Sequence, residues 1–252
     1  MGDEHLRGKL RSVTAPWLDG EVLAFDLETT GVDKFTDVPV SFALVTLKGG
    51  DVIEQRYSLV DPGRAIPEGA SKIHGISTER ARDEGMALAD AVEEISSALV
   101  DASRRGVPVT GFNLSYDLTM IDSCNRAQFK AGLIQRGWAG PVLDPLVIDR
   151  GLVRWRDTKR TLGDLCSAYG IVNDAAHDAQ GDAVASAKLL YAIARERPEV
   201  GDVALDLLYE QEILWHKHWI GSFNDYLMRK GGKGVDDRDF EWPIPTPLET
   251  LF

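Results

Sequence analysis

The chain is poor in cysteine and in positive charge, and it contains no long apolar run. Two cysteines in 252 residues, Cys124 and Cys166, are too few for a disulfide framework, and each lies in an apolar stretch with a helical pattern. We therefore expect buried free thiols. No run of about 18 apolar residues is present, so no membrane span is expected. The first eight residues lack an apolar signal region. Together these absences predict a cytoplasmic protein.

The shortage of positive charge limits the kinds of partner that the chain can bind. Lys and Arg number 28 against 40 Asp and Glu, a net charge of −12. This balance argues against a broad basic face that coats nucleic acid. It leaves room for an enzyme that holds a short strand end, because bound metal ions and a few local cations can reverse the sign inside one cleft.

The order of the apolar patterns is typical of an α/β domain. Three β-rich runs at about 21–27, 39–47 and 52–60 come first, and Lys48-Gly49-Gly50-Asp51 between the last two indicates a hairpin and an antiparallel meander. Further strands are expected at about 107–112 and 142–148. Helices are expected at about 86–103, 115–130, 161–169 and 178–195. This order predicts a mixed β-sheet flanked by helices.

A long helix at about 203–230 forms a C-terminal helical extension. We expect it to pack on the domain through one apolar stripe: Tyr209, Ile213, Ile220, Phe223 and Leu227. The helix then ends at Gly231-Gly232-Lys233-Gly234. The predicted organisation is a domain over 1–200, a packed helix over 201–232 and a flexible Pro-rich tail over 233–252.

The tail ends on Leu251-Phe252 and resembles the short hydrophobic peptides that dock on sliding clamps, although it lacks their usual leading Gln. One interpretation is a tether to a polymerase or clamp. The other is an unstructured tail.

Two carboxylates stand at the end of the first expected strand. Side chains alternate along a strand, so Asp26 and Glu28 lie on one face, about 6–7 Å apart, while Phe25 and Leu27 point to the other. The two charges repel each other unless a cation lies between them, and hard divalent ions such as Mg²⁺ prefer oxygen ligands. A strand end whose acids face water is the alternative.

A third acid, Asp117, follows the expected strand at 107–112. Asn113 is a plausible N-cap for the next helix, which places Asp117 about one turn into that helix, at the carboxyl end of a strand where α/β sites form. An acid that merely stabilises a helix N-terminus is an equally simple reading.

The last acid, Asp182, lies in an Ala-rich helix whose neighbouring positions suit core packing. An inward-facing acid is costly there unless it is paired or bound to metal. His177 precedes the helix, and a histidine with a pKa near 6.5 is suited to take a proton from an attacking water. A surface histidine at a helix start is the alternative.

Taken together, Asp-x-Glu on the first strand, an acid after Gly-Phe-Asn, and His-x4-Asp resemble the three motifs of the DEDDh 3′–5′ exonucleases. The branch that they resemble is the DnaQ-like one, which includes the DNA polymerase III epsilon subunit. The resemblance covers about residues 20–195 and includes Ile73-His74-Gly75-Ile76 and Thr161-Leu162-Gly163-Asp164-Leu165-Cys166. The matching residues are Asp26, Glu28, Asp117, Asp182 and His177.

The resemblance implies a ribonuclease-H-like fold and two divalent metal ions, Mg²⁺ or Mn²⁺, about 3.5–4 Å apart. Asp26 would bridge both ions, Glu28 and Asp182 would hold the ion that carries the attacking water, and Asp117 would help to hold the other. His177 would take the proton of that water. The product would be a nucleoside 5′-monophosphate from a 3′ end.

Candidate substrate contacts lie around these acids. The resemblance places the terminal nucleotide near Leu27, Thr29 and Thr30, with His74, Phe112 and Asn113 as further candidates. Phe112 can stack on a base or belong to the core. The densest basic stretch can meet phosphates or form a solvated loop: Arg150, Arg154, Arg156, Lys159 and Arg160.

Three functions follow from these motifs. The first is a 3′–5′ exonuclease on single-stranded or frayed DNA ends, of the proofreading or repair type. The second is the same chemistry on RNA or short oligoribonucleotides, since contacts to a 2′-OH cannot be read from a sequence. The third is a non-catalytic binding or scaffold module on the same fold.

Overall fold

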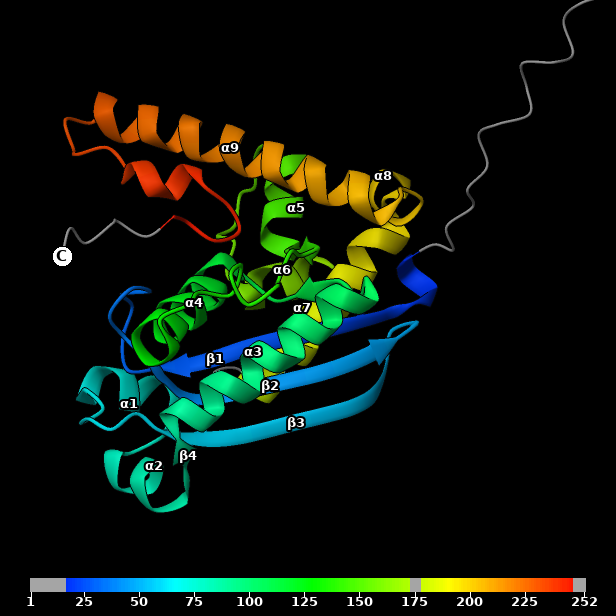
Figure 1. Ribbon diagram of the computed structural model, residues 1–252. Helices are drawn as coiled ribbons and strands as arrows, with labels where there is room; N and C mark the ends of the chain where they lie inside the picture. The colour runs from blue at the N-terminus through cyan, green and yellow to red at the C-terminus, as the bar shows by residue number, and fades with distance from the viewer. Residues whose placement is uncertain (1–16, 173–177, 247–252) are drawn as a thin grey trace, which may run out of the picture.

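The computed structural model of the chain describes residues 17–172 and 178–246, and the structural statements below refer to these ranges (Figure 1). A six-stranded sheet has the order β4-β3-β2-β1-β5-β6. The strands are β1 (Glu21–Thr29), β2 (Pro39–Lys48), β3 (Asp51–Asp61), β4 (Met86–Ala87), β5 (Val109–Thr110) and β6 (Val142–Leu143). The expected mixed sheet flanked by helices is confirmed.

The first three strands form the antiparallel meander that the sequence predicts. β1 pairs with β2, placing Asp26 opposite Ala43, and β2 pairs with β3. On its other side β1 pairs in parallel with β5, which pairs in parallel with β6. β1 is therefore a central strand, and its carboxyl end lies at the border between the antiparallel and parallel parts of the sheet.

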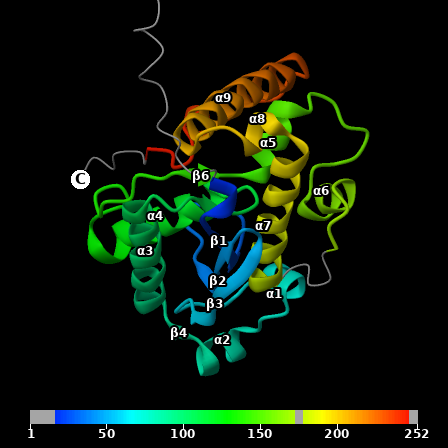
Figure 2. The same cartoon turned by 90° about the vertical axis from the view of Figure 1, so that its right-hand side faces the viewer.

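Helices cover both faces of this sheet (Figure 2). α3 and α4 lie on one face, and α7 lies on the other. The helices are α1 (Glu68–His74), α2 (Thr78–Glu84), α3 (Leu88–Arg105), α4 (Ser115–Phe129), α5 (Pro145–Leu152), α6 (Leu162–Ala168), α7 (Ala179–Glu196), α8 (Pro198–Gly201) and α9 (Leu205–Arg229), with 3₁₀ turns η1 (Trp17–Asp19) and η2 (Asp237–Phe240).

Alternation along β1 supplies both cores. Leu23, Phe25 and Leu27 pack with α3 and α4, whereas Val22 and Ala24 pack with α7. Asp26 and Glu28 continue the series of alternate positions that begins with Val22 and Ala24, so they face the α7 side. The face of the two acids is therefore set by the same alternation that builds the hydrophobic layers.

Two expected elements differ in the structure. The strand expected at 107–112 is reduced to β5, and the strand expected at 142–148 is wrong beyond Leu143, because α5 begins at Pro145. Asp144 caps α5 by accepting a hydrogen bond from the amide of Leu146, 2.9 Å away. An Asp-Pro pair is a helix-start signal, and it prevails over the β-like apolar run.

The long C-terminal helix α9 is confirmed, and its expected packing stripe is partly right, since Ile220 is buried and Tyr209 packs on the core. Its buried residues are Leu208, Glu212 and Ile220, whereas Ile213 and Phe223 are exposed. α9 packs on α5, where a Cβ on Gly151 would lie 2.2 Å from the ring of Trp215, so only glycine fits.

Residues 233–246, part of the tail expected to be flexible, fold back along α9 through η2 (Figure 1). The indole of Trp242 is buried there, 6.1 Å from the ring of His216. Residues 247–252, including the Leu-Phe end, lie outside the described ranges.

Both cysteines are buried free thiols, as expected. Within the described ranges, no helix combines the length and the apolar character that crossing a membrane requires.

Candidate active site

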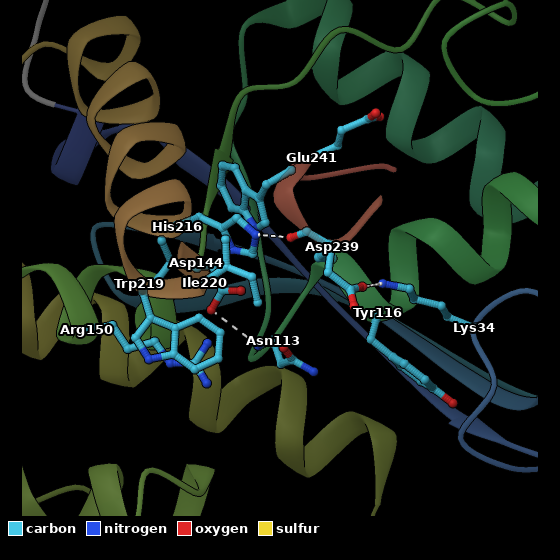
Figure 3. A pocket seen from close by; sticks show the side chains of 13 residues that line it. Lys34, Asn113, Tyr116, Asp144, Arg150, His216, Trp219, Ile220, Asp239 and Glu241 are labelled. Carbon is cyan, nitrogen blue, oxygen red and sulfur yellow. Dashed lines mark hydrogen bonds and ion pairs between the residues drawn. The ribbon is translucent and has the colours of Figure 1, made fainter. Parts of the chain in front are cut away.

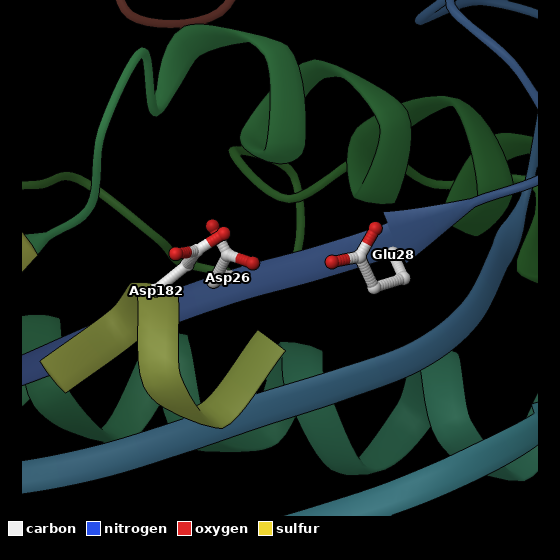
Figure 4. A group of neighbouring side chains, drawn as sticks. All are labelled: Asp26, Glu28 and Asp182. Carbon is white, nitrogen blue, oxygen red and sulfur yellow. The ribbon is translucent and has the colours of Figure 1, made fainter. Parts of the chain in front are cut away.

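Acids from distant parts of the chain meet at the carboxyl end of β1. Asp26 and Glu28 project from β1, and Asp182 projects from the first turn of α7 (Figure 4). One carboxylate oxygen from each lies within 4.8 Å of the others. Three hard oxygen donors at this spacing form a set that can hold a divalent cation.

Asp117 approaches the same point from α4. It is buried, and after burial itself its charge is the largest influence that raises the pKa of Asp26, so it lies near that carboxylate. Gly111 makes this approach possible, since a Cβ there would lie 2.5 Å from the carbonyl oxygen of Phe25. The start of α4 is therefore pressed directly against β1.

The electrostatics of this cluster disfavour negative charge. Burial, followed by the charges of Asp117 and Asp182, raises the pKa of Asp26 well above its usual range. Burial likewise raises the pKa of Asp117, although backbone amides, that of Leu27 included, act against it. Burial and the charges of Asp182 and Asp178 raise the pKa of Glu28 to about 7. A bound cation would offset this repulsion.

His177 lies outside the described residues. Asp178, which follows it, is an acid that the sequence interpretation missed. It caps α7 by accepting a hydrogen bond from the amide of Gly181, and its charge raises the pKa of both Asp26 and Glu28. The N-cap position of Asp178, four residues before Asp182, was readable in the sequence as a helix-start signal.

The predicted capping role of Asn113 is wrong. The residue before α4 is Leu114, which makes no side-chain cap, and Asn113 has a φ of +60°. The amides of Asn113 and Leu114 instead donate to the carboxylate of Asp144, at 3.2 and 2.9 Å. Asn tolerates the left-handed conformation better than most residues, and its side chain is left exposed.

The six expected substrate contacts do not all face the acids. Leu27 belongs to the core on the opposite face of β1. The Thr30 side chain is buried and donates to Asp37 at 2.7 Å, so it holds the loop after β1. Phe112 is half-buried against the α7-side core. Of these three side chains, only that of Phe112 is partly accessible.

Thr29 and His74 lie next to each other at the carboxyl end of β1. Thr29 donates to the carbonyl of Gly31 at 2.7 Å and lies 3.1 Å from the hydroxyl of Tyr116. Burial lowers the pKa of His74, against an opposing effect of the Thr29 backbone. The buried Nε2 of His74 has no hydrogen-bond partner among the described residues.

Tyr116 was missed by the sequence interpretation. Its hydroxyl donates to the carbonyl oxygen of Gly31 at 2.5 Å. This bond ties the first turn of α4 to the residues that follow β1. Apart from its place next to Asp117, nothing in the sequence around this tyrosine indicates a role at the site.

The basic stretch divides into two kinds of residue. Asp149, fully buried, is bound by Arg156 at 2.5 Å and by Arg160 at 2.8 Å. These two arginines therefore neutralise a buried acid within the domain. Arg150 makes no such pair.

A mixed sheet in this order, with acids gathered at the end of its first strand, has the ribonuclease-H-like fold that exonuclease I also has. The exonuclease family model, RNase_T, matches residues 23–190, more than half of the chain, and the chain belongs to this family. The expected recognition as a DnaQ-like exonuclease is confirmed.

Similar proteins cover the same region. A PolC-type DNA polymerase III of Lacticaseibacillus paracasei is 28% identical over 179 residues, which are 70% of this chain and 11% of the polymerase. E. coli exonuclease I in complex with a dT13 oligonucleotide superimposes with a TM-score of 0.62 at 24% identity, covering 72% of this chain and 42% of that chain. The zinc-bound complex of that enzyme with single-stranded DNA gives a TM-score of 0.63 at 23% identity, over 80% and 44% of the two chains.

The chain thus spans about a tenth of the polymerase and less than half of exonuclease I. α9 and the segment after it lie outside the residues that the family model matches.

Proposed function

We propose that the protein is a metal-dependent 3′–5′ exonuclease that releases nucleoside 5′-monophosphates from DNA 3′ ends. One observation carries this proposal: a carboxylate oxygen from each of Asp26, Glu28 and Asp182 lies within 4.8 Å of the others. Asp117 lies near Asp26. The polymerase and exonuclease I likenesses favour a DNA substrate with a single-stranded or frayed end.

The residues fit divalent metal ions. The donor set consists of carboxylate oxygens, which Mg²⁺ and Mn²⁺ prefer. Burial and neighbouring acids raise the pKa of Asp26 and bring that of Glu28 to about 7, and a bound cation would offset this repulsion. Asp26 would contact both ions, Glu28 and Asp182 would hold one, and Asp117 would help to hold the other. When bound, the ions supply activation of the attacking water and stabilisation of charge on the phosphate.

The side chains of the protein accept the proton of the attacking water and bind the terminal nucleotide. We assign His177 as the group that takes the proton of the attacking water. The new bond forms between the water oxygen and phosphorus as the bond from phosphorus to the 3′ oxygen of the penultimate nucleotide breaks. That oxygen leaves with the bonding electron pair and is protonated from solvent. We assign Thr29, His74 and Phe112 to the terminal nucleotide, with Leu27 and Thr30 acting through their backbone and Asn113 through its exposed side chain.

The wider context is also a proposal. We take residues 1–200 as the catalytic domain, 201–232 as its C-terminal helix and 233–252 as a tail that can tether a polymerase or clamp. The PolC-type relatives support association with a polymerase.

Oligonucleotides labelled at the 5′ end test the proposal. With Mg²⁺ or Mn²⁺, single-stranded and 3′-recessed DNA should shorten one nucleotide at a time, nucleoside 5′-monophosphate should accumulate, and EDTA should stop the reaction. A 3′-terminal phosphorothioate linkage should block shortening, whereas a blocked 5′ end should not. Faster cleavage of a matched RNA would favour the ribonuclease alternative, and binding without cleavage in every metal would favour a scaffold.

A further inference from the structure

A pocket of about 190 Å³ lies beside the acidic cluster, between the start of α4, α5, α9 and the segment around η2 (Figure 3). Its lining includes Asn113, Tyr116, Arg150, His216, Trp219 and Trp242. Asn113 and Tyr116 come from the same turn of chain that carries Asp117. The pocket therefore adjoins the turn that carries Asp117, and about half of its lining residues come from beyond the family match.

The acids that line this pocket already have partners. The carboxylate of Asp144 accepts hydrogen bonds from three backbone amides. Asp239 forms an ion pair with Lys34 at 2.8 Å, and Glu241 accepts a hydrogen bond from the amide of Thr246. The side-chain charges of these acids are therefore engaged within the protein.

Arg150 is different. Its guanidinium carbon lies 3.4 Å from the ring centroid of Trp219, so the group is held flat on the indole (Figure 3). Within the described part of the chain it makes no hydrogen bond or ion pair. Burial lowers its pKa to about 10, which leaves it charged at neutral pH. A positioned guanidinium with free N–H donors matches the geometry of a phosphate.

We propose that Arg150, positioned by Trp219, binds a phosphate of the single strand upstream of the cleaved bond. This inference rests on the proposed exonuclease function. The strand would leave the acids past Asn113 and Tyr116 and enter the pocket, with its phosphate on Arg150. α9 thereby contributes to substrate binding, and the ligand is a nucleic-acid phosphodiester rather than a free nucleotide.

The chain contains a matched control for this pair. Arg154 lies over the ring of Trp155 at 5.8 Å, and both residues are exposed away from the pocket. Substitutions at Arg154 and Trp155 remove the same chemical groups from the same region of sequence. These control variants therefore measure how much the loss of any arginine or tryptophan in this region changes substrate cleavage.

The test compares a long substrate with a short one. Octathymidylate extends past the active site, whereas the p-nitrophenyl ester of thymidine 5′-monophosphate does not. In Arg150→Gln and Trp219→Leu, the ratio of kcat/KM on octathymidylate to that on the ester should fall about tenfold. Arg154→Gln and Trp155→Leu should change the ratio less than about twofold. Arg150→Lys, which keeps the charge but not the flat fork, should give an intermediate ratio.

Binding gives a second, independent readout. With Ca²⁺ in place of Mg²⁺, the slope of log affinity for octathymidylate against log salt should fall by about 0.7 in Arg150→Gln, as for one lost single-strand phosphate contact. Thermal unfolding checks that each variant folds. If Trp219→Leu does not fold, the results for Arg150→Gln alone test the inference.

An unchanged ratio and salt slope in Arg150→Gln, or equal losses in Arg154→Gln, would overturn the inference. If the wild type cleaves neither substrate, the proposed function fails. The binding comparison of Arg150→Gln with Arg154→Gln then still decides whether Arg150 holds a phosphate.

Discussion

The Oε2 atom of Glu212 accepts a hydrogen bond of 2.8 Å from the backbone amide of Asp144, and both side chains are buried. The carboxylate of Asp144 in turn accepts the amides of Asn113 and Leu114, directly before α4. α9 is thus connected in two steps to the helix that carries Asp117. This connection joins Asp144, inside the region that the family model matches, to Glu212, which lies beyond that region.

Replacing Glu212 with alanine should lower the free energy of unfolding by about 2–4 kcal/mol, because the amide of Asp144 loses its partner and a cavity forms. Glu212→Gln keeps an acceptor oxygen and should cost less. Burial raises the pKa of Glu212, so its ionisation destabilises the fold as pH rises through that pKa, and Gln removes this dependence. Urea unfolding of both variants, with the exposed Glu210→Ala as control, measures this. Equal effects of Glu210→Ala and Glu212→Ala would refute the connection.

The periodicity of the first 60 residues was sufficient to predict the meander and the shared face of Asp26 and Glu28. Alternation is local, and the two-residue turn between β2 and β3 fixes the pairing. β5 and β6 are two residues each and carry little pattern of their own, because β5 depends on pairing with β1 and β6 on pairing with β5. Strand length at 142–148 was misjudged for this reason.

The clustering of Asp26, Glu28 and Asp182 could be predicted because each stands in a distinctive local motif. Glu212 could not, since a single glutamate on an amphipathic helix is normally solvated. The different roles of the arginines in the basic stretch could not be predicted from the sequence either. Arg156 and Arg160 form ion pairs with Asp149, whereas Arg150 lies over the ring of Trp219 on α9. That division depends on which acid is buried, which is a property of the packed domain.

Arg156→Ala should lower the free energy of unfolding by about 2–4 kcal/mol, because Asp149 is left buried with one remaining arginine. Arg154→Ala, which removes an exposed arginine, should change it by less than about 0.5 kcal/mol. Chemical denaturation measures both values. Adding Asp149→Asn to Arg156→Ala should restore part of the loss. If Arg154→Ala and Arg156→Ala cost the same, Arg156 does not compensate a buried charge.

Asp26→Asn should reduce exonuclease activity by at least about 10³-fold, since this carboxylate is assigned to both metal ions. In EDTA at pH 8 the variant should unfold at the same temperature as the wild type or higher, because it removes a charge that burial and Asp117 disfavour. Single-turnover cleavage and thermal unfolding test the two parts. Asp51→Asn, at the far hairpin of the sheet, is the control. Retention of activity in Asp26→Asn would exclude the assigned role.

Removing metal should make stability fall as pH rises. Glu28 has a folded pKa of about 7 against an ordinary 4.5, so the folded state binds more protons between these values. Stability from this group is complete below pH 4.5 and is lost as pH rises through 7. In EDTA, the wild type should lose thermal stability across this window relative to Glu28→Gln, and Mg²⁺ should recover most of the loss at pH 8. Parallel melting curves for the two proteins in EDTA would contradict the raised pKa.

His177→Ala should slow hydrolysis by about 10²–10⁴-fold while leaving metal binding largely intact, since the residue is assigned to proton transfer rather than to the carboxylate set. In the wild type, kcat should decline at acidic pH, because the protonated ring cannot accept the proton of the water. The variant should lose this acidic limb of the pH profile. His218→Ala, which removes an exposed histidine from α9, should keep both rate and profile. Titration with Mn²⁺ separates the two roles: a large loss of metal affinity in His177→Ala would assign it to the metal site, and an unchanged rate would leave the proton transfer to another group.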